Sequence, residues 1–86
     1  MSALNDLPNI SRVIAGDLQK AGISAAEELR SIGSRESFIL IRLHSDNSAC
    51  LSKLYALEGA VQGIRWHSLT DETKNELKLF YKSLKK

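Results

Sequence analysis

The sequence predicts an all-α fold, and three observations support this prediction. Apolar residues recur every three or four positions through most of the chain, which is the spacing of a helix that buries one face. Glycines and capping residues separate these stretches. The single proline, Pro8, lies near the N-terminus and leaves the rest of the chain free to form helices. We therefore expect one domain, residues 1–86, folded as a compact bundle of five helices.

The first helix is predicted over residues 9–21, where the apolar positions form one stripe. Asn9 or Ser11 can cap its start, because a short polar side chain can accept a hydrogen bond from a backbone N–H of the first turn. The end of the helix is indicated by Gly22, which can adopt the left-handed conformation while Ile23 folds back on the last turn.

The second and third helices are separated by a glycine. Ser24 and Glu27 have the spacing of a capping box, which predicts the start of a short second helix. Gly33 is expected to end this helix, and Ser34 to cap a third helix over residues 35–43.

The third helix has an alternative, because the apolar run at residues 38–41 would also suit a buried strand. The preceding caps and the lack of a partner strand favour a helix.

The remaining chain predicts two further helices. A fourth helix is predicted over residues 48–62, with Gly63 at its end. Thr70 is expected to cap the last helix, whose buried stripe consists of Leu77, Phe80, Tyr81 and Leu84.

Composition and charge restrict the possible functions. The formal net charge is +2, so overall charge does not establish nucleic-acid binding. The single cysteine excludes an intramolecular disulfide and favours a reducing compartment. The chain has no apolar run of the roughly 20 residues that a membrane span needs, and its N-terminus does not resemble a signal peptide. These observations predict a cytoplasmic protein without membrane contact.

The sequence contains no convincing catalytic or metal-binding pattern. His44 and His67 have neither cysteine nor carboxylate at metal-ligand spacing, and Cys50 has no histidine at the spacing of a nucleophile and its base. Glu58 has no second acid or base beside it, and we expect it to pair with Arg65 or to cap a neighbouring helix. We therefore expect no enzymatic activity, no metal and no cofactor.

A connector at residues 64–69 carries the only tryptophan, Trp66, next to His67. One interpretation is a contact or stacking site for a ligand. The other, which we favour, is a core plug whose indole N–H bonds to a carbonyl group.

Two segments, at residues 7–12 and 29–34, share the form Leu-x-x-Ile followed by a small residue. Both resemble the helix-hairpin-helix motif, although the first has Ser11 where the motif has glycine. Unpaired N–H groups and the helix dipole favour anions at a helix start. The alternative is an ordinary tight turn between packed helices. In the second copy, the expected phosphate-binding residues are Gly33, Ser34 and Arg35.

Two other groups of residues are candidates for contact with a partner. Lys74, Lys78 and Lys82 lie four positions apart and so share one helix face, where they can attract a phosphate backbone. The alternative is that these lysines only favour the helix dipole and solubility. Gly59 and Ala60 form a small-residue patch at which another helix can approach closely.

The segments at residues 7–11, 21–23, 29–38 and 54–69 resemble, in their order, the C-terminal domain of the TfoX/Sxy competence regulators. The most specific piece is the run Leu-Tyr-Ala-Leu-Glu-Gly-Ala at residues 54–60, followed by Trp66. The resemblance covers nearly the whole chain and implies a fold related to helix-hairpin-helix and SAM-like bundles. It also implies a link to the regulation of DNA-uptake competence genes in bacteria. Full-length regulators carry an additional N-terminal domain, so we expect a stand-alone version or an excised piece.

Our leading hypothesis is a non-enzymatic helical module that acts in the regulation of competence or transcription. It would contact DNA through the residues at 33–35 and the three lysines, or it would contact a regulatory protein. The alternative is a pure protein-interaction or homodimerisation domain that does not bind nucleic acid.

Overall fold

The computed structural model describes residues 3–84, apart from the side chain of Asn5, and it confirms the all-α prediction. The described residues form five α-helices and two short 3-10 helices, and none of them is in a strand. The order along the chain is η1 (Leu4–Asp6), α1 (Arg12–Lys20), α2 (Ala26–Ile32), α3 (Ser34–His44), α4 (Leu51–Gln62), η2 (Trp66–Ser68) and α5 (Asp71–Ser83).

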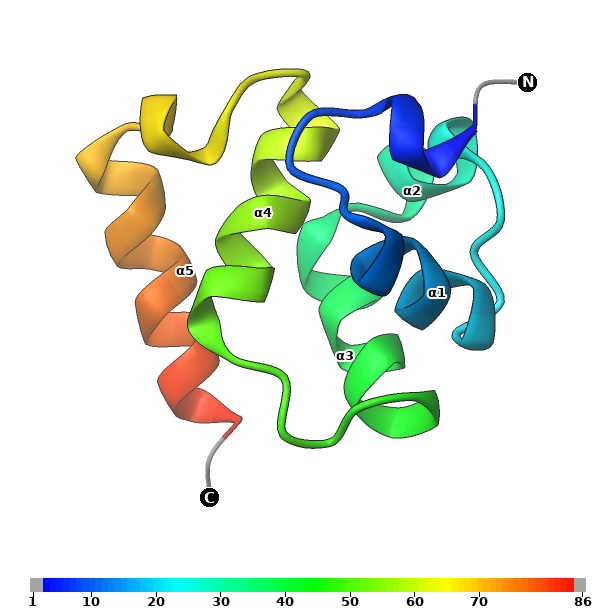
Figure 1. Cartoon of the computed structure of the whole chain (residues 1–86). Coiled ribbons are helices and arrows are strands. Elements are labelled where there is room, and N and C mark those ends of the chain that lie inside the picture. The colour runs from blue at the N-terminus through cyan, green and yellow to red at the C-terminus, as the bar shows by residue number, and fades with distance from the viewer. Residues whose placement is uncertain (1–2, 85–86) are drawn as a thin grey trace.

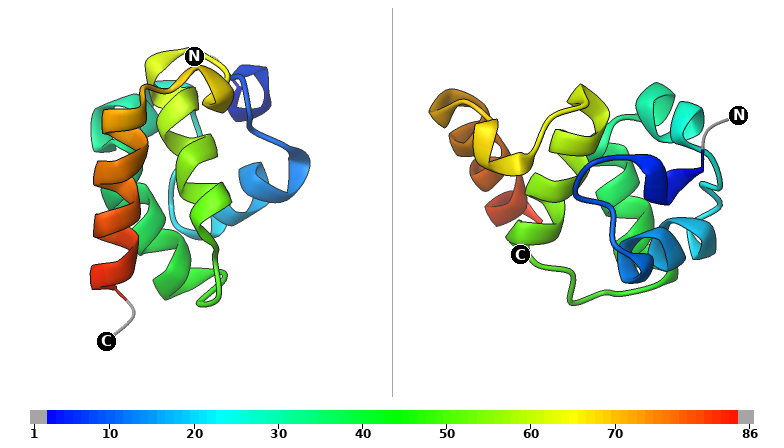
Figure 2. Two further views of the ribbon diagram at one scale, coloured as in Figure 1. Left: turned by 90° about the vertical axis from the view of Figure 1, so that its left-hand side faces the viewer. Right: turned by 45° about the horizontal axis from the view of Figure 1, so that its top comes forward.

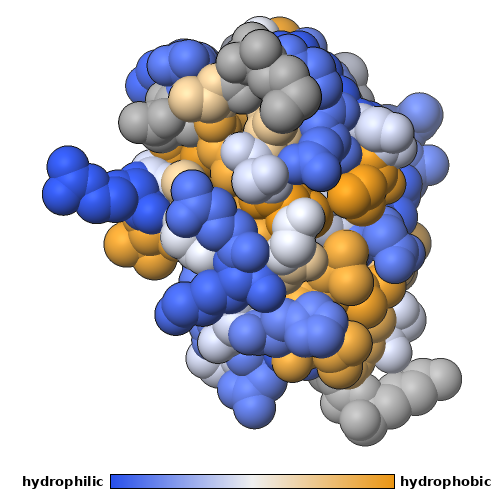
Figure 3. Space-filling view, turned by 90° about the vertical axis from the view of Figure 1, so that its right-hand side faces the viewer, coloured by the Kyte–Doolittle hydropathy of each residue, from blue (hydrophilic) through white to orange (hydrophobic). Residues whose placement is uncertain are grey.

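Helices α3 and α4 form the centre of the bundle (Figure 1). Helix α3 packs against α1, α2 and α4, and α4 also packs against α5 and η2. Helices α1 and α2 therefore lie on one side of the central pair, and α5 lies on the other (Figure 1). Helix α5 runs beside α4 in the opposite direction, as both views of Figure 2 show. On the α1–α2 side, hydrophobic side chains reach the surface between hydrophilic ones (Figure 3).

The core draws fully buried side chains from each of the five α-helices. Phe38 and Ile41 are both fully buried in α3, and their spacing of three residues is that of a helix rather than a strand. In α5, Leu77 is fully buried, whereas the ring of Tyr81 is half-buried and meets Phe38 edge to face at 6.0 Å between centroids. Burying one such side chain stabilises the fold by about 1.5–3 kcal/mol. The largest fully buried apolar residues are Phe38, Leu18, Ile23, Leu29, Ile41, Leu54, Leu57 and Leu77.

Helix α1 is shorter than predicted at its start. Ser11 is the cap, and its Oγ accepts a hydrogen bond of 3.2 Å from a backbone N–H in the first turn. Asn9 lies before the helix with a φ of 70°, so of the two predicted caps Ser11 is the one that the helix uses. The predicted end is confirmed, because Gly22 has a φ of 89° and the Ile23 N–H donates to the Leu18 carbonyl at 2.8 Å.

Two predicted helix caps use different partners in the structure. The N–H and hydroxyl of Ser24 both donate to Glu28 Oε1, at 2.9 and 3.0 Å, so the acidic partner is Glu28 and not Glu27. Ser34 does not cap α3 but is its first residue, only 3% exposed. Its hydroxyl donates to the carboxylate of Glu58 in α4. A local motif cannot reveal this contact, because the two residues lie 24 positions apart.

Helix α4 also begins later than predicted, whereas two other boundaries match the predictions. Helix α4 begins at Leu51 rather than at residue 48, because the N–H and hydroxyl of Ser48 donate to Asp46 Oδ1 and form a turn. Gly63 ends this helix with a φ of 76°, as expected. Thr70 caps α5 and accepts a hydrogen bond of 3.1 Å from a backbone N–H of the first turn.

Candidate functional site

Side chains from three elements meet where α4, η2 and α5 come together. We call Tyr55, Trp66, His67 and Lys74 the aromatic–lysine cluster. The rings of Tyr55 and Trp66 stack with 6.1 Å between centroids, and those of Trp66 and His67 with 4.0 Å. Lys74 Nζ lies 5.7 Å from the centre of the Trp66 ring. Because His67 is exposed and the other three are half-buried, the cluster presents an aromatic surface beside a positive charge.

The position of the connector depends on Asn9. Its Nδ2 donates to the Ile64 carbonyl at 2.8 Å, and the Trp66 N–H donates to its Oδ1 at 3.0 Å. The left-handed backbone of Asn9 is one that asparagine tolerates better than most residues. Asn9 therefore fixes the backbone from which Trp66 extends.

Gly59 and Ala60, predicted as a contact patch for a partner, are buried by this chain itself. A Cβ added at Gly59 would lie 2.5 Å from Asn9 Nδ2 and 2.8 Å from the Ile64 carbonyl oxygen. The small residue does permit a close approach, as the sequence indicated. The approaching segments, however, are the chain before α1 and the connector after α4.

Lys74, Lys78 and Lys82, which we call the lysine row, follow one flank of α5. Residues four apart rise about 6 Å along a helix, so the row extends for about 12 Å. Lys78 and Lys82 are exposed. The ion pairs found within residues 3–84 are both made by Lys53, so the row takes part in neither. Asp71 lies one turn before Lys74 and offsets one of the three lysine charges, so the flank keeps an excess of positive charge.

The start of α3 differs from the predicted phosphate site. The Gly33 N–H already donates to the Leu29 carbonyl at 2.8 Å. The buried Ser34 hydroxyl donates to Glu58, which places a carboxylate at this end of the helix. A second negative charge there would be repelled. We therefore leave Gly33 and Ser34 out of the candidate interface.

Arg35 lies apart from the lysine row. It is exposed, and its guanidinium carbon lies 5.9 Å from the centre of the Phe80 ring. Phe80 is two residues from both Lys78 and Lys82, which corresponds to about 200° around the helix. The structure therefore places Arg35 and the lysine row on opposite flanks of α5, and the six predicted DNA-binding residues do not form one surface.

Comparison with known proteins identifies the family. The profile of the TfoX C-terminal domain matches residues 1–81. The chain belongs to this family. The family is competence-related and regulatory in type. No curated protein matches the chain.

Two crystal structures from Listeria monocytogenes resemble this TfoX C-terminal domain over nearly its full length. An uncharacterized protein in a triclinic form shares 54% identity at a TM-score of 0.93, covering 96% of this chain and 93% of that one. A protein of unknown function in a tetragonal form shares 55% identity at a TM-score of 0.92, covering 95% and 99%. The fold described above is therefore one that crystallography has observed in similar sequences.

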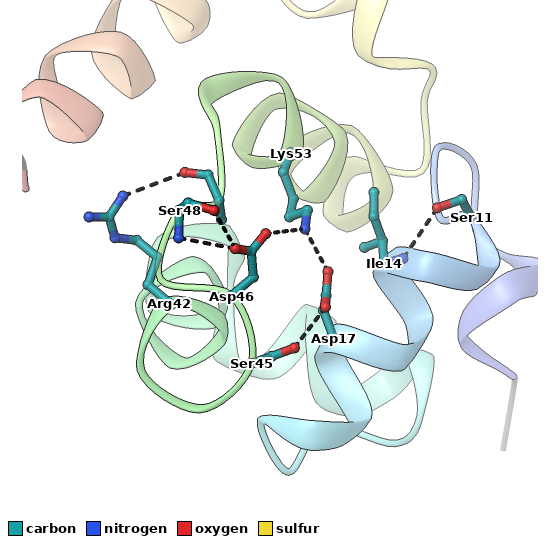
Figure 4. Close-up of polar contacts among 9 residues, drawn as sticks. Ser11, Ile14, Asp17, Arg42, Ser45, Asp46, Ser48 and Lys53 are labelled. Carbon is teal, nitrogen blue, oxygen red and sulfur yellow. Dashed lines mark hydrogen bonds and ion pairs between the residues drawn. The ribbon is translucent and has the colours of Figure 1, made fainter.

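A second polar cluster of this TfoX C-terminal domain joins α1 to the start of α4 (Figure 4). Lys53 Nζ lies 2.6 Å from Asp17 Oδ2 and 3.2 Å from Asp46 Oδ2, and the Ser45 hydroxyl donates to Asp17 Oδ1 at 2.7 Å. Burial raises the pKa of Asp17, but hydrogen bonds from Lys53 and Ser45 outweigh it and hold that pKa below its ordinary value. Burial lowers the pKa of Lys53, and its two carboxylate partners outweigh this and raise it. Because each of these charges is paired, the cluster acts as a structural tie.

Among residues 3–84, no three side chains of His, Cys, Asp or Glu gather as metal ligands would. No helix of the described chain has the length and apolar character that crossing a membrane requires. Cys50 is a free, exposed cysteine.

Sequence reasoning missed two residues that shape the site. Tyr55 was not among the candidate residues, but its ring stacks on Trp66 and its hydroxyl donates to the Lys74 carbonyl at 3.4 Å. Asn9 was considered only as a helix cap. The tendency of asparagine to adopt left-handed conformations was the one local signal of its role. Trp66, expected as a core plug, packs against the core but remains half-buried.

Proposed function

We propose that this domain is a non-enzymatic regulatory module that binds nucleic acid through the phosphate backbone. The observation that carries the proposal is the lysine row on the flank of α5, of which Lys78 and Lys82 are exposed. Lysines that neutralise phosphates release condensed counterions, and this gives binding that does not depend on sequence. Membership of a competence-related family supports a regulatory setting.

The modest net charge of +2 is compatible with this proposal because the charges are unevenly placed. A row of like charges raises the local potential even where the total charge is small. The cytoplasm is also part of this proposal, because a chain with a single cysteine suits a reducing compartment.

The proposal is tested by fluorescence anisotropy of a short labelled duplex at several salt concentrations. We expect non-specific binding with a Kd of about 10⁻⁴–10⁻⁶ M that weakens steeply with salt. The double variant Lys78→Gln and Lys82→Gln should bind more weakly, and the slope of log K against log salt should fall by roughly 2.

The matched control is the double variant Arg12→Gln and Lys20→Gln. It removes the same charge from exposed positions of α1, on the other side of the bundle (Figure 1). It should retain most of the wild-type affinity and slope. Equal weakening by both double variants would show that only net charge matters, and unchanged binding by the α5 variant would remove the lysine row from the interface.

The alternative function, association with a second copy of the chain, has one observation in its favour. Leu43 is 71% exposed and borders a hollow of about 270 Å³ at the end of α3. The hollow is lined by Ile39, Arg42, Leu43, Asn47 and Leu84. Sedimentation at increasing concentration tests it. A protein that stays monomeric throughout would remove this alternative, and a dimer dissociated by Leu43→Gln would support it.

A further inference from the structure

We propose that the preferred ligand is single-stranded nucleic acid, whose bases stack on His67 while its phosphates follow the lysine row. This inference rests on the proposed function and goes further by naming the class of nucleic acid. It combines two features that meet at Lys74, which belongs to both the aromatic–lysine cluster and the lysine row.

The aromatic side of the argument concerns an accessible ring face. The His67 ring stacks on Trp66 at 4.0 Å between centroids, with 29° between their planes, and His67 is exposed. Because Trp66 occupies one face of the ring, we assign the stacked base to the opposite face. Stacking of a base on an aromatic side chain is worth about 1–3 kcal/mol and tolerates any base. In a duplex the bases are paired and stacked on one another, so only unpaired bases can use this face.

The charged side of the argument concerns length and direction. The lysine row begins at the aromatic–lysine cluster with Lys74 and continues for about 12 Å along α5 to Lys82. A stacked strand advances about 3.4 Å per nucleotide, so the row matches roughly four nucleotides. This is the lower end of the site sizes of modules that bind single strands.

The cluster is held in place before any ligand arrives. Asn9 fixes the backbone at Trp66 through two hydrogen bonds, of 2.8 Å to the Ile64 carbonyl and 3.0 Å from the Trp66 N–H. The Tyr55 hydroxyl, at 3.4 Å from the Lys74 carbonyl, connects α4 to α5 within the cluster. A preformed surface lowers the entropy lost on binding.

The test uses the fluorescence of Trp66, the only tryptophan in the chain. The protein is titrated with an oligothymidylate and, separately, with an abasic oligomer of the same length and charge. We expect the oligothymidylate to bind at least about fivefold more tightly, which corresponds to one stacked base, and to quench Trp66 more strongly. A duplex of equal length should bind more weakly than the oligothymidylate.

Two variants at one exposed position separate stacking from charge. His67→Ala should reduce the affinity for oligothymidylate to that for the abasic oligomer, and His67→Phe should restore it. The salt dependence of binding should be the same in both variants.

Equal affinities for the oligothymidylate and the abasic oligomer, or a preference for the duplex or for an acidic peptide, would overturn the inference. In that case, salt-dependent binding of the abasic oligomer would still support the phosphate contact of the proposed function. Absence of binding to every nucleic acid would overturn both proposals.

Discussion

Replacement of Gly59 by alanine offers a quantitative test of how the connector is packed. In an ordinary helix interior this change stabilises by about 1 kcal/mol, because alanine is the better helix former. Here the added Cβ would lie 2.5 Å from Asn9 Nδ2, 2.8 Å from the Ile64 carbonyl oxygen and 3.1 Å from the Trp66 nitrogen. Two of these three atoms belong to the backbone and cannot swing aside as the end of a side chain can.

The size of the effect follows from these contacts. Overpacking of this kind costs about 1–3 kcal/mol. Moving Asn9 away also weakens its two hydrogen bonds to the connector, which adds about 1–2 kcal/mol. After the helix-propensity gain is subtracted, Gly59→Ala should lower the free energy of unfolding by roughly 1–4 kcal/mol. In a domain of this size, 1 kcal/mol corresponds to a fall in Tm of about 4–8 °C.

The assay is thermal and urea unfolding followed by circular dichroism, with Gly16→Ala as the matched control. Gly16 is also inside a helix, but a Cβ added there meets nothing within 4 Å. Gly16→Ala should therefore stabilise by about 0.5–1 kcal/mol. A Gly59→Ala variant as stable as the wild type would refute the reasoning, because the space at Gly59 would then not limit the packing.

Three further predictions follow from the polar contacts. Lys53→Met should lower the free energy of unfolding by about 1–3 kcal/mol, because it leaves the buried Asp17 carboxylate with one partner fewer. The control Lys20→Met, at an exposed site, should change the free energy of unfolding by less than about 0.5 kcal/mol. The pKa of Asp17 is lowered in the folded state, so below about pH 4 the unfolded state binds more protons than the folded state does. The free energy of unfolding therefore falls as the pH is lowered through that range. Acid unfolding should show this loss in the wild type and less of it in Asp17→Asn; identical profiles would contradict it. Asn9→Ala should cost about 1–3 kcal/mol and shift the emission of Trp66, and Asn9→Gly should cost less because glycine tolerates the positive φ. Wild-type stability and emission in Asn9→Ala would show that the two Asn9 hydrogen bonds do not hold the connector in place.

The helices were predictable where their signals are local. Gly22, Gly63 and Thr70 end or begin helices as expected, because a left-handed glycine or a capping hydroxyl needs only its immediate neighbours. Ser34 was misassigned because its partner, Glu58, lies in another helix. Asn9 was misassigned for the same reason, since its partners in the connector are 55 and 57 residues away.

The candidate site shows the same division between local and long-range information. The lysine row could be predicted because residues four apart always share a helix face. The separation of Arg35 from this row depends on how α3 packs near Phe80, which the spacing of residues does not reveal. The stacking of Tyr55 on Trp66 likewise depends on the path of the connector over α4. Sequence therefore predicted the lysine row and gave Trp66 and His67 as one interpretation of a stacking site, and the structure was needed to bring Tyr55 and Lys74 beside them.

The most direct test of the central claim is to locate the contact with nucleic acid by NMR. Amide and indole resonances of the labelled domain would be followed while a short oligonucleotide is added at low salt. We predict shifts that concentrate at Lys78, Lys82 and the Trp66 indole, with little change in α1 and α2. Shifts confined to residues 33–35 or to α1, or no shifts at saturating oligonucleotide, would contradict the proposal that this face of the domain binds nucleic acid.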